Sequence, residues 1–243
     1  MQDNLNSKYK SIVDFLQMSS EIYFNETGIK VKIEIVNDFS FNARVSKIEE
    51  KVYKIEIRHG CLCLENLIEN ITNRYTEDDL KSFWRFRKLN IFEKNAGDTY
   101  REELNQLFGS IILLHIFFHE CGHITAKYID KENGTYAEMQ PSDNGGYEKQ
   151  EQEMVADWLS TKFLYKSMFF ATIGTDKIDF EELLSILEQL TILYWLSLTI
   201  EFQIFDSVHT GDVPDYSLLT HPHPAVRLYY SLDAMQECIL DIF

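Results

Sequence analysis

The first sixty residues change from a helical to a strand-like period of apolar and polar positions. Over residues 5–20, apolar side chains recur at helical spacing, which predicts a short amphipathic helix. Apolar and polar residues then alternate over 29–36, 41–48 and 52–57, as in strands with one buried face. Residues 1–60 are therefore predicted to contain one helix and a small, mostly antiparallel sheet with one solvated face.

After Gly60 the pattern is helical almost to the end of the sequence. Thr76, with Asp79 three residues later, resembles a capping box that opens a helix running to about Lys88. Turn-forming residues indicate a long loop at about 129–149, and loops of that length are usually functional. Further helices are predicted at about 99–128, 150–170, 179–205 and 223–240.

The order of these elements predicts an α+β fold, mainly helical, with its sheet near the N-terminus. No internal repeat and no linker rich in proline, glycine or serine divides the chain. We therefore expect a single domain over residues 1–243, with the sheet in 1–60 and the helical part in 61–243.

Charge and cysteine content narrow the classes of function. The 23 lysines and arginines are outnumbered by 39 aspartates and glutamates, a formal net charge of −16. This balance argues against nucleic-acid phosphates and anionic lipid headgroups as partners.

The chain shows no secretion-signal pattern, and its four cysteines do not resemble a disulfide framework. The apolar stretches at 111–118 and 192–200 are interrupted or shorter than the about 20 residues of a membrane span. We expect a cytoplasmic protein with no membrane span and no nucleic-acid partner.

The segment most suggestive of chemistry is a His-Glu-x-x-His pattern at residues 119–123. Residues four apart share a helix face, so His119 and His123 can bind one ion. Zinc lowers the pKa of a bound water to near 7, and the carboxylate of Glu120 can then take its proton. The alternative is two helix histidines with polar partners. The surrounding helix is apolar on nearly every face, which favours a metal because buried polar groups must be satisfied.

A third ligand is expected about 30 residues further on, because catalytic zinc has three protein ligands and one open position. Glu153 and Asp157 are one helical turn apart. Glu153 can bind the ion while Asp157 hydrogen-bonds the distal nitrogen of a ligand histidine. Glu151 points elsewhere on a helix and is ranked below Glu153. Without the upstream motif, this acidic run would indicate only a solvated helix face.

These residues resemble the gluzincin metallopeptidases. His119-Glu-Cys-Gly-His123, followed by Glu153-Met-Val-Ala-Asp157, is similar to their pattern, in which a glutamate one helix downstream is the third zinc ligand. The resemblance implies a zincin-like fold, with a sheet above the motif helix and an edge strand that pairs with an extended substrate.

A C-terminal segment strengthens this likeness. Thr220-His221-Pro222, with Arg227 six residues after the histidine, resembles a segment of the HtpX-like and prenyl-protease-like branch. In its architecture the chain also resembles soluble prophage-encoded peptidases. In a zincin-like fold, Val52–Ile57 or Ile29–Val36 would be the edge strand that pairs with substrate.

His221 has two possible roles. As a catalytic residue it would donate a hydrogen bond to the oxyanion that forms during hydrolysis. As a structural residue it would cap or pack at a helix start, with Pro224 in the first turn.

Other residues near these motifs are given structural roles. His115 lies roughly 12 Å from His123 along a helix, too far for both to share one ion with His119, and is expected in the core or near the ligands. Cys121 is expected to be a small buried apolar residue. Arg227 is expected to form an ion pair with an acidic residue of a helix.

The favoured function is a zinc-dependent endopeptidase in which Glu120 activates the attacking water, acting on one host or partner protein. One alternative is a peptidase-like binding or sensor module that holds zinc structurally or holds none. Another is a zinc hydrolase that acts on a non-peptide amide.

Overall fold

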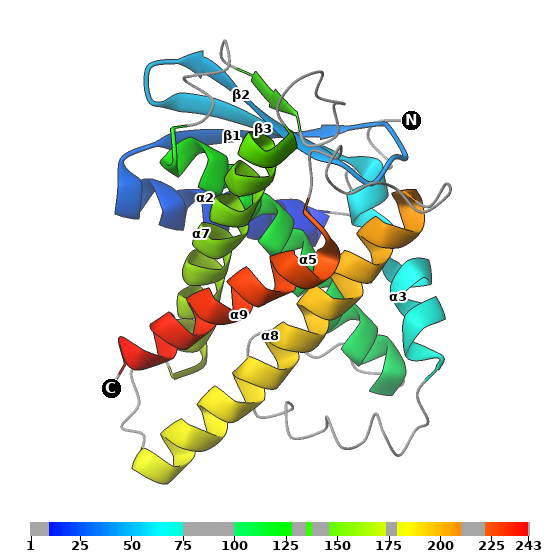
Figure 1. Ribbon diagram of the computed structural model, residues 1–243, viewed down its shortest axis with the longest axis vertical. Coiled ribbons are helices and arrows are strands. Elements are labelled where there is room, and N and C mark those ends of the chain that lie inside the picture. Colours follow the sequence, from blue (N-terminus) through cyan, green and yellow to red (C-terminus); the bar gives the residue numbers. More distant parts are fainter. Residues whose placement is uncertain are drawn as a thin grey trace.

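The computed structural model of the protein describes residues 10–74, 100–127, 135–137, 146–173, 179–209 and 222–242. These residues are mostly helical, with a small mixed sheet at one end of the molecule (Figure 1). The elements are α2 (Lys10–Thr27), β1 (Lys30–Val36), β2 (Ala43–Glu49), β3 (Val52–Arg58), the 3-10 helix η1 (His59–Leu62), α3 (Glu65–Thr72), α5 (Tyr100–Thr125), β4 (Thr135–Ala137), α7 (Gly146–Ile173), α8 (Phe180–His209) and α9 (Pro224–Leu240).

The periodicity of the sequence predicted most of these elements. The three predicted strands are confirmed as β1, β2 and β3, and the four long helices after residue 99 are confirmed as α5, α7, α8 and α9. The first helix, α2, continues seven residues beyond its predicted end at residue 20. The short elements α3 and β4 were not predicted, and β4 lies inside the predicted loop. The capping box at Thr76 and the helix to about Lys88 lie outside the described residues.

The sheet is mixed, whereas the sequence predicted a mostly antiparallel one. The strand order is β1-β3-β2-β4, with β1 parallel to β3 and the other two pairings antiparallel. The hairpin of β2 and β3 places β3 beside β1, so β1 and β2 are not neighbours despite being consecutive. Of the two segments expected as the edge strand, Val52–Ile57 is internal, because β3 has a partner on each side, whereas Ile29–Val36 corresponds to the edge strand β1. Among the described strands, the edges are β1 and β4.

Helix α5 runs through the centre of the molecule (Figure 1). It packs against α3, α7 and α8 and against the inner strands β2 and β3. Apolar residues on nearly every face of α5 let it be buried on all these sides at once, and its side chains from Ile111 to Ile124 are all buried. The same helix therefore carries His115, His119, Glu120 and His123 into the core.

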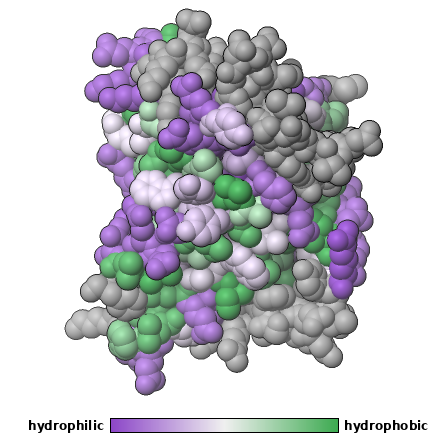
Figure 2. All heavy atoms as spheres, viewed as in Figure 1, coloured by the Kyte–Doolittle hydropathy of each residue, from purple (hydrophilic) through white to green (hydrophobic). Residues whose placement is uncertain are grey.

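The expectation that no segment could span a membrane is wrong. Leu104–Thr125 of α5 and Phe180–Phe205 of α8 are long and apolar enough to cross one, by length and composition. The sequence argument looked only for uninterrupted apolar runs. The polar residues in these helices, such as His, Ser and Gln, are few and scattered, so the mean hydropathy stays high. Each helix contains an apolar window of 18 residues. In α5, 83% of this window is buried, as in a core helix, whereas in α8 44% is buried. On the face shown in Figure 2, apolar residues gather over the helical part of the molecule.

Candidate metal centre

The candidate site forms where α5 crosses α7. The two helices come together at Gly122 and Ala156, and a Cβ atom added to Gly122 would lie only 2.8 Å from the backbone oxygen of Ala156. This close approach is possible because both residues are small. It brings the turn of α5 that carries His119 and His123 against the turn of α7 that carries Glu153.

Three side chains meet at this crossing. The Nε2 atom of His119 lies 3.1 Å from Glu153 Oε2 and 3.1 Å from His123 Nε2. The Nε2 atom of His123 lies 3.5 Å from Glu153 Oε1. All three residues are buried, and their potential ligand atoms lie within 4.8 Å of one another. This cluster could hold a metal ion.

The spacing of the two imidazole nitrogens is close to that of ligands on one ion. Nitrogen and oxygen ligands bind zinc at about 2.0–2.2 Å, so two ligands of a tetrahedral ion lie about 3.3–3.6 Å apart. The two Nε2 atoms are 3.1 Å apart. Each lies near a different oxygen of Glu153, His119 at 3.1 Å from Oε2 and His123 at 3.5 Å from Oε1.

Asp157 and Arg227 hold the first histidine in place. His119 Nδ1 lies 2.8 Å from Asp157 Oδ1. The guanidinium of Arg227, from α9, donates to both carboxylate oxygens of Asp157, from Nε at 2.7 Å and from Nη2 at 2.8 Å. It also lies over the rings of Phe202 and Phe205 of α8, at 4.8 and 5.2 Å from their centroids. The ion pair expected for Arg227 is confirmed, and its partner is Asp157.

Charges in this buried cluster shift two pKa values in opposite directions. Burial alone would lower the pKa of His119, but Asp157 and Glu153 raise it well above its ordinary value. Burial alone would raise the pKa of Asp157, but Arg227 and His119 hold it well below its ordinary range. The two carboxylates therefore favour the protonated form of His119 in the metal-free protein.

The remaining candidate residues differ in burial and in whether they join the cluster. Glu120 is fully buried on α5, directly after the first histidine. Glu151 is exposed on α7 and does not join the cluster. His221 lies outside the described residues. The cap of α9 is His223, whose Nδ1 accepts a hydrogen bond from the backbone N–H of Ala225 at 3.1 Å.

His115 belongs to a second buried pair. Its Nδ1 lies 3.0 Å from Glu201 Oε1 of α8, and its ring centroid is 6.4 Å from that of His119. It does not join the ligand cluster, in agreement with its expected core position. Sequence reasoning did not identify Glu201. The available signal was an acidic residue directly after the apolar stretch at 192–200, since a carboxylate in such a helix needs a buried partner.

Comparison with known proteins finds no matching family model, no matching curated protein and no matching solved structure. The assignment of function therefore rests on the residues of the cluster and their geometry.

Proposed function

We propose that the protein is a zinc-dependent endopeptidase of the gluzincin type, with a zincin-like fold. The observation that carries the proposal is the buried cluster of His119, His123 and Glu153, whose potential ligand atoms lie within 4.8 Å of one another. Two imidazoles and one carboxylate are the protein ligands of several catalytic zinc sites. The contact of Asp157 with the distal nitrogen of His119 supports the assignment, because it orients the ring for a metal on the other nitrogen.

The side chains divide the chemistry between them. Zinc supplies a Lewis acid that lowers the pKa of water and polarises a carbonyl oxygen. Glu120 takes the proton of the attacking water and passes it to the amine that leaves when the peptide bond breaks. Arg227 and Asp157 keep His119 oriented throughout. The role of Glu120 is supported by its place in the motif and by its burial on the ligand-bearing helix.

The substrate is an extended segment of a specific host or partner protein. Such a segment pairs with a sheet edge through its backbone, and β1 and β4 are the edges among the described strands. We assign this role to β4, because it comes between the two helices that supply the ligands.

The test compares two glutamate variants. Wild-type protein, Glu120→Gln and Glu151→Gln are loaded with zinc and incubated with peptides from a whole-proteome digest, and new peptide ends are identified by mass spectrometry. Wild type and Glu151→Gln are expected to cleave the same peptides. Glu120→Gln is expected to cleave them about 100- to 10,000-fold more slowly, because it cannot accept a proton. Elemental analysis should find about one zinc per chain in all three.

The exposed Glu151 is the matched control, since the same atoms are exchanged outside the cluster. Undiminished cleavage by Glu120→Gln would contradict the mechanism. Cleavage that survives removal of zinc would contradict the metal assignment.

The burial of the ligands favours a second candidate function. His119 is 2% exposed, and Glu120, His123 and Glu153 are 0% exposed. Catalytic zinc keeps one position open to water, whereas structural zinc is closed by protein ligands. A binding or sensor module with structural zinc would retain the metal and cleave no peptide, and X-ray absorption would show no water among the ligands.

A further inference from the structure

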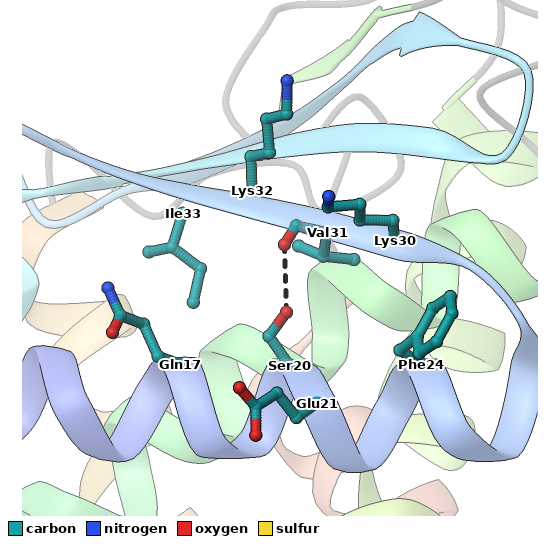
Figure 3. Close-up of a pocket in the computed structure, with 8 residues that line it drawn as sticks. All are labelled: Gln17, Ser20, Glu21, Phe24, Lys30, Val31, Lys32 and Ile33. Carbon is teal, nitrogen blue, oxygen red and sulfur yellow. Dashed lines mark hydrogen bonds between the residues drawn. The ribbon is translucent and has the colours of Figure 1, made fainter.

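A groove lies between α2 and the open edge of the sheet. Its volume is about 420 Å³, within the range of about 300–1,000 Å³ typical of ligand sites. Figure 3 shows β1 above the groove and α2 below it, with Phe24 at one end and Gln17 at the other. Between them, Ser20 Oγ donates to the backbone oxygen of Val31 at 2.9 Å. β1 packs against β3 and α2, whereas the metal ligands stand on α5 and α7.

The backbone of β1 presents hydrogen-bonding groups above this groove. The N–H of Lys30 donates to the backbone oxygen of Lys51, the residue before β3, so the backbone groups of Lys30 and of every second residue after it face β3. Successive residues of a strand point their N–H and C=O groups to opposite edges. The N–H and C=O groups of Val31, Ile33 and Ile35 therefore face outward, and no described strand pairs with them. The oxygen of Val31 already accepts the hydrogen bond from Ser20.

The charged and the apolar side chains of β1 lie on opposite faces of the sheet. Lys30, Lys32 and Glu34 are exposed, and Figure 3 shows Lys32 pointing to the side of the sheet away from α2. The charge of Glu34 is offset by Lys54 of β3, whose Nζ lies 3.1 Å from Glu34 Oε2. Val31 and Ile33 point to the α2 side and line the groove. Glu21 of α2 also lines it from below, which disfavours a second acidic group on that side.

We propose that this edge and groove bind an extended peptide segment in which acidic and apolar residues alternate. The segment adds a strand beside β1 through the N–H of Val31 and the outward N–H and C=O groups of Ile33 and Ile35. Its apolar side chains enter the groove beside Phe24, and its acidic side chains lie beside Lys30 and Lys32. An acidic strand is selected because those two lysines repel a basic one, in a chain whose formal net charge is otherwise strongly negative.

The binding test uses the full, zinc-loaded chain and a fluorescein-labelled peptide of alternating glutamate and valine. Its anisotropy should rise saturably, and a peptide of alternating lysine and valine should bind much more weakly. The double variant Lys30→Glu/Lys32→Glu should weaken binding of the acidic peptide by about tenfold or more, because two attractive pairs become repulsive. The matched control, Lys47→Glu/Lys127→Glu, makes the same charge change at exposed lysines off this edge and should bind as wild type does.

Amide hydrogen exchange measured by NMR locates the bound strand. With acidic peptide, the amides of Val31, Ile33 and Ile35 should exchange more slowly, while those of Lys32 and Glu34, which already face β3, should change little. Equal binding of the two peptides, equal effects of the two double variants, or no saturable binding would overturn the proposal. So would dimerisation of the wild type in sedimentation velocity with these amides protected, since a second copy would then occupy the edge.

Discussion

The charge of Asp157 is shared between two residues that reach it from different helices. His119 contacts one of its oxygens, and Arg227 donates to both. All three are buried, so the carboxylate depends on these two partners rather than on water. Loss of either partner leaves a buried charge only partly compensated, and the orientation of the first ligand changes with it.

Arg227→Met should therefore weaken both folding and metal binding. Removing one partner of a buried ion pair costs about 3–5 kcal/mol in the free energy of unfolding, measured by urea denaturation. Zinc affinity, measured against a competing chelator, should fall about 10- to 100-fold, as for other residues that orient metal ligands. Lys166→Met is the control, since the partially exposed pair of Lys166 and Asp241 contributes little. Zinc affinity unchanged by Arg227→Met would contradict a role in orienting His119.

The raised pKa of His119 predicts that zinc stabilises the protein more at higher pH. In the metal-free protein, the charged His119 contributes stability below the ordinary histidine pKa, and this is lost as pH rises through the raised pKa. Zinc must displace a proton from His119, so its affinity should rise about tenfold per pH unit below that raised pKa. The increase in melting temperature caused by zinc should therefore grow from pH 6 to pH 8, and an equal increase at each pH would be inconsistent with this competition.

At the scale of elements, the candidate centre depends on how closely α5 approaches α7. The contact at Gly122 and Ala156 sets this distance. At a second contact between the same two helices, Ser160 Oγ of α7 donates to the backbone oxygen of His115 at 2.8 Å. These small and hydroxylic residues let the helices lie close enough for Glu153 to reach both histidines.

Gly122→Ala should disrupt the centre, although alanine is the better helix former. Its Cβ would lie 2.8 Å from Ala156 O and 2.9 Å from Ala156 Cα, so the helices must separate. Gly109→Ala, on the same helix, is the control, because its Cβ would meet only Ile68 Cδ1 at 3.4 Å. Calorimetry should show a destabilised Gly122→Ala that binds zinc poorly, and a Gly109→Ala stabilised by up to about 1 kcal/mol. Equal zinc affinity of the two variants would show that the crossing is adaptable.

At the scale of the whole molecule, one cluster connects three helices. His119 and His123 belong to α5, Glu153 and Asp157 belong to α7, and Arg227 ties α9 to them. The sheet contributes no side chain to this cluster among the described residues.

Removal of zinc should therefore loosen the helices more than the sheet. Hydrogen exchange can be measured by mass spectrometry before and after zinc is removed with a chelator. Backbone amides of α7, α9 and the last turns of α5 are expected to exchange faster after chelation. Exchange in β1 and β3 should change little, because their ladder does not depend on the centre. A uniform increase over all elements would instead indicate that zinc stabilises only the global fold.

Local patterns predicted most of the elements and suggested the candidate ligand residues, but they did not predict how the elements meet. Alternation in β1 and β3 was visible in the sequence, yet it carries no information on which strands become neighbours. Helical spacing placed Glu153 and Asp157 on one face, and the proximity of that face to His119 was inferred by resemblance. The partner of His115, Glu201, comes from a helix 86 residues away, so no local pattern could connect them. His221 lies outside the described residues, and its role stays a prediction.

The position of Arg227 has a consequence for biosynthesis. It follows Asp157 by 70 residues, so at about 5–20 residues per second a ribosome delivers it roughly 4–14 seconds after the acidic group it neutralises. Until then, a nascent chain lacks the cation that pairs with Asp157, the residue that contacts His119. The buried ion pair that orients His119 is therefore completed only once α9 has been translated.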